Sequence, residues 1–163
     1  MRNVITAALL MVSASSVLAQ WRYDEGKDEM RGTVTAFAEL RSTNAAQLRF
    51  PYAGGTTLSI LLRQSGQRQD AMIVVNKGQF VCGFDGCRYA VKFDDKLEQI
   101  SLSRASSGSS DVLFVSNSTQ FIKQLRSAKA VIVEVEFYSH GREQFAFAPA
   151  GLNWPLASAA AKK

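Results

Sequence analysis

The chain has 163 residues, a formal net charge of +5 at pH 7, two cysteines and one histidine. This length suits one domain with a hydrophobic core. The basic residues are spread along the chain without a run typical of nucleic-acid binding, which argues against a nucleic-acid partner. Two cysteines and one histidine cannot supply the four ligands of a structural zinc site, and no phosphate-binding or dinucleotide-binding glycine motif is present. We therefore expect neither a metal nor a cofactor.

The first 19 residues have the three parts of a cleavable signal peptide. Arg2 is positively charged, residues 4–12 are uncharged and mostly apolar, and Val17 and Ala19 stand at the positions that a signal peptidase reads. The apolar run is far shorter than the about 20 residues of a membrane-spanning helix. We predict cleavage between Ala19 and Gln20, and a periplasmic or secreted mature protein without a transmembrane span. A short N-terminal core helix is the alternative.

The mature chain is expected to form a single β-rich domain over residues 20–154, followed by a flexible tail over 155–163. Residues 20–32 are polar and charged and carry no strand pattern. After them, apolar residues alternate with polar ones or form short apolar runs at 34–40, 58–63, 72–75, 89–93, 100–102, 131–138 and 145–147. Turn-forming residues separate these runs. The pattern predicts a mainly all-β fold, an antiparallel β-sandwich, with a barrel as the alternative.

One short helix is expected between the late strands. Residues 117–119 offer side-chain oxygens for an N-cap, and Phe121, Ile122, Leu125 and Ala128 follow at helical spacing. A helix of about ten residues is marginal alone, so it must dock on the sheet. We expect the core to include Leu58, Ile60, Leu62, Ile73, Val75, Val91, Phe93, Leu113, Phe121, Leu125, Val133, Val135, Phe147 and Leu152.

The two cysteines, Cys82 and Cys87, lie close together in the sequence and are expected to form a disulfide bond in an oxidising compartment. Residues 80–81 and 89–91 flank them as strand-like runs, so the cysteines should face each other across a hairpin. A loop this short contributes about 2 kcal/mol in the chain-entropy treatment. The spacing differs from the C-x-x-C of redox sites.

The tip of this predicted hairpin is the candidate binding loop. If the tip is exposed, Phe84, Asp85 and Arg88 would form a rigid contact surface. In the alternative, Phe84 folds back onto the core. The sequence favours neither. Other aromatic residues that need not all be interior are Phe37, Phe50, Tyr52, Tyr89 and Tyr138.

The sequence contains no clear set of catalytic residues. Glu134 and Glu136 would lie on one face of a strand, about 7 Å apart by strand rise, a spacing that glycosidases use. Alternating glutamates are also ordinary on an outward strand face. His140, before Gly141, is expected to be an exposed turn histidine, and no nucleophile-elbow or metalloprotease motif occurs. We therefore predict that the protein is not an enzyme.

Several short motifs carry a family resemblance. Leu58 to Arg63 reads L-x-I-x-L-R, a strand ends in Phe93-Asp94-Asp95, and the helix has Phe121-Ile122-x-x-Leu125. This layout resembles the periplasmic accessory proteins of the VasI/TagO kind, which are associated with type VI secretion systems. The C-x-x-x-G-C element at Cys82 to Cys87 resembles invasion-associated locus B proteins, which are exported β-domains. Both resemblances imply an envelope β-domain without catalytic residues.

Export, a bridged hairpin and the lack of a catalytic set lead to one expected function. We expect a non-enzymatic periplasmic binding or accessory protein that contacts an envelope protein or a cell-wall component, and the resemblance adds a link to a secretion apparatus. The alternative is an inhibitor or immunity protein that blocks a cell-wall enzyme or toxin with a rigid loop. A third hypothesis is a cell-wall hydrolase that uses Glu134 and Glu136.

Overall fold

The computed structural model describes residues 20–156. Residues 1–19, where we predict the signal peptide, and residues 157–163, within the predicted tail, lie outside the described part. The described elements are β1 (Arg22–Asp28), β2 (Thr33–Arg41), β3 (Leu58–Ser65), β4 (Arg68–Val75), β5 (Cys87–Phe93), β6 (Lys96–Arg104), β7 (Val112–Val115), α1 (Ser118–Ser127), β8 (Val131–Phe137) and β9 (Gly141–Phe147). None of them is a helix long and apolar enough to cross a membrane.

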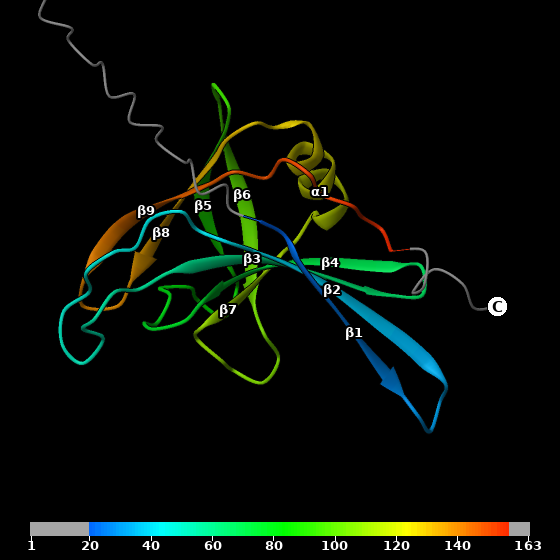
Figure 1. Ribbon diagram of the computed structural model, residues 1–163. Helices are drawn as coiled ribbons and strands as arrows, with labels where there is room; N and C mark the ends of the chain where they lie inside the picture. Colours follow the sequence, from blue (N-terminus) through cyan, green and yellow to red (C-terminus); the bar gives the residue numbers. More distant parts are fainter. Residues whose placement is uncertain (1–19, 157–163) are drawn as a thin grey trace, which may run out of the picture.

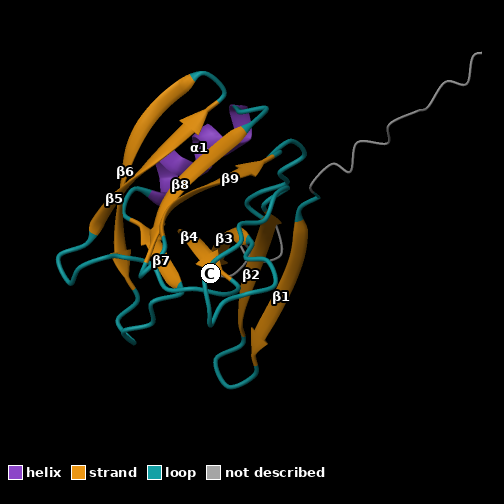
Figure 2. Cartoon of the chain, turned by 90° about the vertical axis from the view of Figure 1, so that its left-hand side faces the viewer, coloured by secondary structure: helices purple, strands orange, loops and turns teal. Residues whose placement is uncertain are grey.

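The nine strands form one antiparallel sheet in the order β1-β2-β3-β4-β7-β6-β5-β8-β9. The sheet bends so that strands β1 to β4 cross β5 and β6 steeply, and the two halves enclose the core between them (Figure 1, Figure 2). The predicted antiparallel β fold, with one short helix between β7 and β8, is confirmed. The sheet does not close into a barrel, and its sandwich-like form comes from one continuous sheet.

The alternation of β3 shows how the core is built. Leu58, Ile60 and Leu62 are fully buried, whereas Leu61 and Arg63 on the other face are half-buried. A buried Leu or Ile side chain contributes about 1.5–3 kcal/mol through removal of apolar surface from water. Every residue predicted for the core is buried except Leu152, which is half-buried and packs against it.

The sequence pattern missed β1, and the reason is its exposure. Residues Arg22 to Lys27 are all exposed, so neither face of the strand carries an apolar series. The strand nevertheless pairs with β2 along its whole length, from Arg22 opposite Glu39 to Asp28 opposite Thr33. Strand β7 also lay outside the predicted runs. Backbone pairing, rather than side-chain alternation, defines β1.

Helix α1 begins and docks as its sequence predicted. The side chain of Asn117 accepts a hydrogen bond from the N–H of Gln120 at 3.2 Å, which satisfies a free donor of the first turn. The Ser118 hydroxyl accepts from the N–H of Ala71 in β4 at 2.9 Å. The ring of Phe121 meets Phe93 edge to face, with centroids 5.6 Å apart. These contacts hold the helix on the sheet.

Two segments, one after β2 and one after β9, form hydrogen bonds that link the two halves of the sheet. After β2, the N–H of Thr43 donates to the carbonyl of Ala146 in β9 at 2.8 Å, and the side chain of Asn44 bonds the backbone of Ala146 and Gln144. After β9, the chain returns over β3 and β4, where the N–H of Leu156 donates to the buried Gln64 side chain at 3.0 Å. These hydrogen bonds link the two halves of the sheet, although its edge strands, β1 and β9, do not pair with each other.

Candidate functional site

The predicted disulfide bond is present. It joins Cys82 to Cys87, whose Cα atoms are 5.1 Å apart. Between them, Gly83 and Gly86 form an isolated β-bridge, with the N–H of Gly86 3.2 Å from the carbonyl oxygen of Gly83. Residues 84 and 85 therefore occupy the tip of a tight turn at the start of β5. We call residues 82–87 the bridged hairpin.

The arms of the bridged hairpin do not pair with each other, which corrects one expectation. From the strand-like runs at 80–81 and 89–91 we expected a hairpin across which the two cysteines face each other. Instead, the N–H of Val81 donates to the carbonyl of Glu136 in β8 at 2.9 Å, and β5 pairs with β6 along its whole length. The loop is therefore closed by the disulfide bond, by the backbone bridge between Gly83 and Gly86, and by side chains.

Tyr89 is the main side chain between the two arms. It is buried, and its hydroxyl donates to the carbonyl of Val81 at 2.7 Å, with the carbonyl of Glu136 at 3.2 Å. Burial raises the pKa of the Tyr89 phenol to about 12, and the nearby negative charge of Glu136 adds to this rise. The phenol therefore stays protonated at neutral pH and remains a donor to Val81.

The tip of the bridged hairpin is fully exposed. The side chain of Phe84 is 98% exposed. Within the described residues, one cation lies over the Phe84 ring: the guanidinium carbon of Arg104 is 5.8 Å from the ring centroid. Arg104 is itself held by a hydrogen bond to the carbonyl of Gly108 at 2.6 Å. Of the two alternatives left open above, the exposed tip is the one observed.

Gly86 allows the bridged hairpin to run close along β6. Its φ of +93° favours glycine, and a Cβ atom at this position would lie 2.6 Å from the carbonyl oxygen of Leu102. Only a residue without a side chain fits between the tip and β6. The position of Phe84 is therefore set by the backbone as well as by the disulfide bond.

The three predicted loop residues do not form one surface. Asp85 is exposed beside Phe84 at the tip. Arg88 instead follows the disulfide bond on the outer face of β5, where it lines a separate cleft together with Gln99 and Arg142. The structure therefore divides the predicted site into an aromatic and acidic tip and a charged base.

The charged cleft lies where β5 and β8 separate. The two strands pair only between residues 91–93 and 131–133, and beyond these residues they enclose a hollow of about 80 Å³. A water molecule takes up about 30 Å³ in the liquid, so this space holds a few waters. It is smaller than the range of about 300–1,000 Å³ that is typical of ligand pockets.

Glu134 and Glu136 share the outer face of β8, as predicted, and both line the charged cleft. They share one cation: Arg142 lies 3.6 Å from the carboxylate of Glu134 and 3.8 Å from that of Glu136. Gln144 also donates to Glu134 at 2.9 Å. The carboxylates thus belong to a charged network with Arg142, and such a network can hold a polar group of a partner or a few waters.

His140 differs from its predicted environment. It lies in the turn between β8 and β9, but its side chain is only 15% exposed rather than open to solvent. Its Nε2 atom is 2.7 Å from the carboxylate of Glu143, and its Nδ1 atom accepts from the N–H of Arg49 at 3.4 Å. The prediction of an exposed histidine was wrong because the segment after β2 folds against this turn.

A second hollow was not predicted. It lies between residues 48–52, 78–79 and 137–140, which come from three distant parts of the sequence. The exposed aromatic residues Phe50 and Tyr138 stand beside it. The only signal in the sequence was that Phe50 and Tyr138 are among the aromatic residues that need not be interior.

Among residues 20–156, no group of three or more His, Cys, Asp or Glu side chains is arranged to hold a metal ion. Comparison with known protein families, with curated proteins and with solved structures found no match to this chain. Function must therefore be inferred from the geometry of the bridged hairpin, the charged cleft and the second hollow.

Proposed function

We propose that this chain is an exported, non-enzymatic binding or accessory protein, and that the bridged hairpin is its contact element. The observation that carries the proposal is the almost complete exposure of Phe84 on a covalently closed turn. A large apolar side chain at such a tip gains free energy only when a partner covers it. A tip that is already ordered also loses little conformational entropy on binding.

The surroundings of Phe84 support a protein partner. Aromatic and arginine side chains are enriched at protein interfaces and often supply most of the binding energy. Here Phe84 stands beside Arg104, and Asp85 adds one charge that can select the partner. An envelope protein, or a charged cell-wall component, fits this chemistry.

Export is the second part of the proposal. It rests on the pattern of residues 1–19 and agrees with the disulfide bond, since such bonds persist in oxidising compartments. A periplasmic or secreted location follows, and the resemblance to VasI/TagO-type proteins suggests service to a type VI secretion apparatus. N-terminal sequencing of the protein from an envelope fraction should begin at Gln20; a chain that keeps Met1 would contradict export by cleavage.

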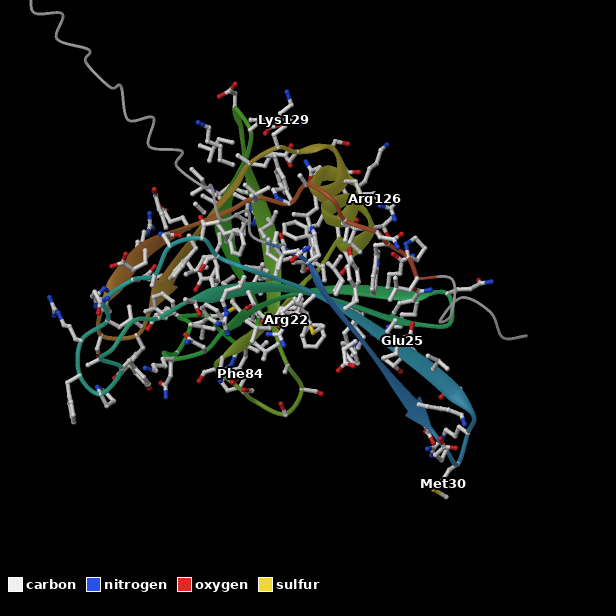
Figure 3. All side chains as sticks on the ribbon, viewed as in Figure 1. Arg22, Glu25, Met30, Phe84, Arg126 and Lys129 are labelled. Carbon is white, nitrogen blue, oxygen red and sulfur yellow. A yellow bond between two sulfur atoms is a disulfide. The ribbon has the colours of Figure 1, made fainter. Side chains whose placement is uncertain are left out.

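Affinity capture from envelope extracts tests the contact element. The wild type should retain a partner that Phe84→Ala loses, whereas Met30→Ala should retain it. Met30 is the matched control because it is 93% exposed at the tip of the β1–β2 hairpin, away from Phe84 (Figure 3). Equal capture by Phe84→Ala and the wild type would overturn the proposal.

An inhibitor or immunity protein is a second candidate, and the projecting tip favours it. A rigid loop with an apolar and an acidic residue at its end can enter the active-site cleft of a cell-wall enzyme or toxin. An inhibition assay against lysozyme and amidases separates this candidate from the first. Phe84→Ala and Asp85→Ala should relieve inhibition, and inhibition that neither substitution changes would exclude the bridged hairpin as the inhibitory element.

The hydrolase hypothesis remains the third proposal. The charged cleft lies beside Glu134 and Glu136, but both carboxylates contact Arg142 and the space holds only a few waters. If the chain cleaved cell-wall glycans, Glu134→Gln and Glu136→Gln would each abolish that activity. Absence of any activity in the wild type would support the non-enzymatic proposal.

A further inference from the structure

The unpredicted hollow between residues 48–52, 78–79 and 137–140 has the composition of a binding site, and we call it the aromatic pocket. Its volume is about 270 Å³. The loop after β2 forms one wall, at the left of Figure 1, and the turn after β8 forms the other. The apolar lining consists of Leu48, Phe50, Pro51, Tyr52, Phe137 and Tyr138.

Two rings of this lining face solvent. Phe50 is 91% exposed and Tyr138 is 68% exposed, although they belong to segments almost 90 residues apart. Isolated apolar residues on a surface need no explanation, but two large rings at the rim of one hollow form a patch. A ligand that enters the hollow would cover both rings.

The floor of the aromatic pocket is tightly packed, so the hollow exists before any ligand arrives. Gly78 has a φ of +118°, and a Cβ atom there would lie 2.9 Å from Leu48 and 3.1 Å from Phe137. The ring of Phe137 in turn stacks on Phe80, with centroids 5.6 Å apart. A preformed site avoids much of the ordering cost of binding.

His140 and the backbone of Gln79, which line the aromatic pocket, are hydrogen-bonded to their neighbours. The two ring nitrogens of His140 face the carboxylate of Glu143 and the N–H of Arg49. The carbonyl of Gln79 accepts from the N–H of Tyr138 at 2.9 Å. Glu143, the nearby carboxylate, is therefore already hydrogen-bonded to His140.

The rim of the pocket carries positive charge. Arg49 lines the hollow, and Lys77 lies next to Gly78 with its ammonium group 3.3 Å from the carbonyl oxygen of Ala53. Within the part of the chain that the structure describes, no ion pair joins either Arg49 or Lys77 to a carboxylate. A cation without an acidic partner in the lining of an apolar hollow is complementary to an apolar group that carries a negative charge.

We propose that the aromatic pocket binds an aromatic side chain flanked by a carboxylate, within a peptide segment of a partner protein. One ring of the ligand would lie in the hollow beside Phe50 and Tyr138, and Arg49 in the lining would pair with the adjacent carboxylate. A neutral sugar fits less well, since it makes no use of the positive charge of Arg49 in the lining. This site is separate from the bridged hairpin and does not depend on the role of Phe84.

The test uses the folded chain and a short peptide, acetyl-Ser-Phe-Asp-Ser-amide, followed by backbone amide signals in NMR titrations. Signals of residues 48–52 and 137–140 should shift in a saturable way. An analogue with Asn in place of Asp should bind about 2- to 5-fold more weakly, because the exposed ion pair is lost. An analogue with Ala in place of Phe should not shift these signals.

Variants of exposed residues separate binding from folding. Tyr138→Ala and Phe50→Ala should each weaken peptide binding by about 5-fold or more. Arg49→Ala should weaken binding of the Asp peptide but not of its Asn analogue, whereas Arg22→Ala, an exposed cation on β1, should change neither. Phe84→Ala should bind the peptide as the wild type does, so failure of the hairpin proposal leaves this one standing.

Three results would overturn the proposal. The first is that the peptide shifts only NMR signals of residues outside the aromatic pocket. The second is that Tyr138→Ala binds the peptide with unchanged affinity, and the third is that the wild type binds the Asp and Asn peptides with equal affinity. A parallel titration with the N-acetylglucosamine trimer distinguishes a glycan site. Shifts at residues 48–52 and 137–140 with that sugar and none with the peptide would also contradict it.

Discussion

The hydroxyl of Tyr89 donates a hydrogen bond to the backbone carbonyl of Val81, 2.7 Å away, and so links the two arms of the bridged hairpin. No β-ladder joins these arms within residues 79–93, which the structure describes in full; their one backbone bridge is between Gly83 and Gly86. The presentation of Phe84 thus depends on this buried phenol and on the disulfide bond, together with the backbone bridge and the close approach of Gly86 to β6.

The first prediction concerns this hydroxyl. Tyr89→Phe keeps the ring but leaves the carbonyl of Val81 without its donor, which should lower the free energy of unfolding by about 1 kcal/mol. For a domain of this size the melting temperature should fall by roughly 2–4 °C. Tyr138→Phe is the control, because the hydroxyl of Tyr138 is exposed and forms no hydrogen bond within the described residues. Equal effects of the two substitutions would contradict the role of Tyr89.

The second prediction is a pH dependence. The pKa of Tyr89 is raised from 10.0 to about 12 in the folded protein, so folding favours the neutral phenol. This contribution to stability is complete below pH 10 and is lost as the pH rises through about 12. The stability difference between the wild type and Tyr89→Phe should therefore shrink above pH 10. Phenolate absorbance should show one group with a pKa of about 12 that Tyr89→Phe lacks; its persistence in the variant would contradict the assignment.

The third prediction concerns the disulfide bond. Only four residues separate Cys82 from Cys87, so its loss should cost about 2 kcal/mol and lower the melting temperature by roughly 4–8 °C. Cys82 is only one member of a core that most of the strands share, so the double substitution Cys82→Ser and Cys87→Ser should leave the circular-dichroism spectrum of the folded domain unchanged. A melting temperature that reductant does not alter would argue against the bond in solution.

The fourth prediction separates backbone strain from steric overlap at Gly86. Gly86 and Gly141 have similar φ values, +93° and +107°, but only at Gly86 would a Cβ atom meet a carbonyl oxygen, that of Leu102. Gly141→Ala should cost about 1–2 kcal/mol from backbone strain alone. Gly86→Ala should cost about 1–3 kcal/mol more, since the overlap forces a backbone shift. Equal unfolding midpoints in denaturant would show that the bridged hairpin does not pack on β6 as described.

Much of the fold follows from local sequence patterns. The alternation of Leu58, Ile60 and Leu62 predicts β3, and Asn117 predicts the start of α1, because both signals depend on neighbouring residues. Strand β1 could not be found in this way. Its side chains are exposed on both faces, so its only signal is pairing with β2.

The candidate sites were less predictable, because they depend on contacts between distant segments. The cysteine spacing predicts the bridged hairpin but not the pairing of Val81 with Glu136, 55 residues further along the chain. His140 was expected to be exposed, but its ring contacts the backbone of Arg49, 91 residues away in the sequence, and the carboxylate of Glu143. The aromatic pocket is formed by three segments that are distant in the sequence, so no local sequence pattern predicts it.

Site-specific photo-crosslinking in cells tests most directly whether the tip of the bridged hairpin is the contact element. A benzophenone amino acid placed at Phe84 should give one dominant adduct in the envelope fraction, and the same probe at Met30 should not give that adduct. Adducts that are absent at position 84, or identical at positions 84 and 30, would contradict the proposal that the bridged hairpin carries the function.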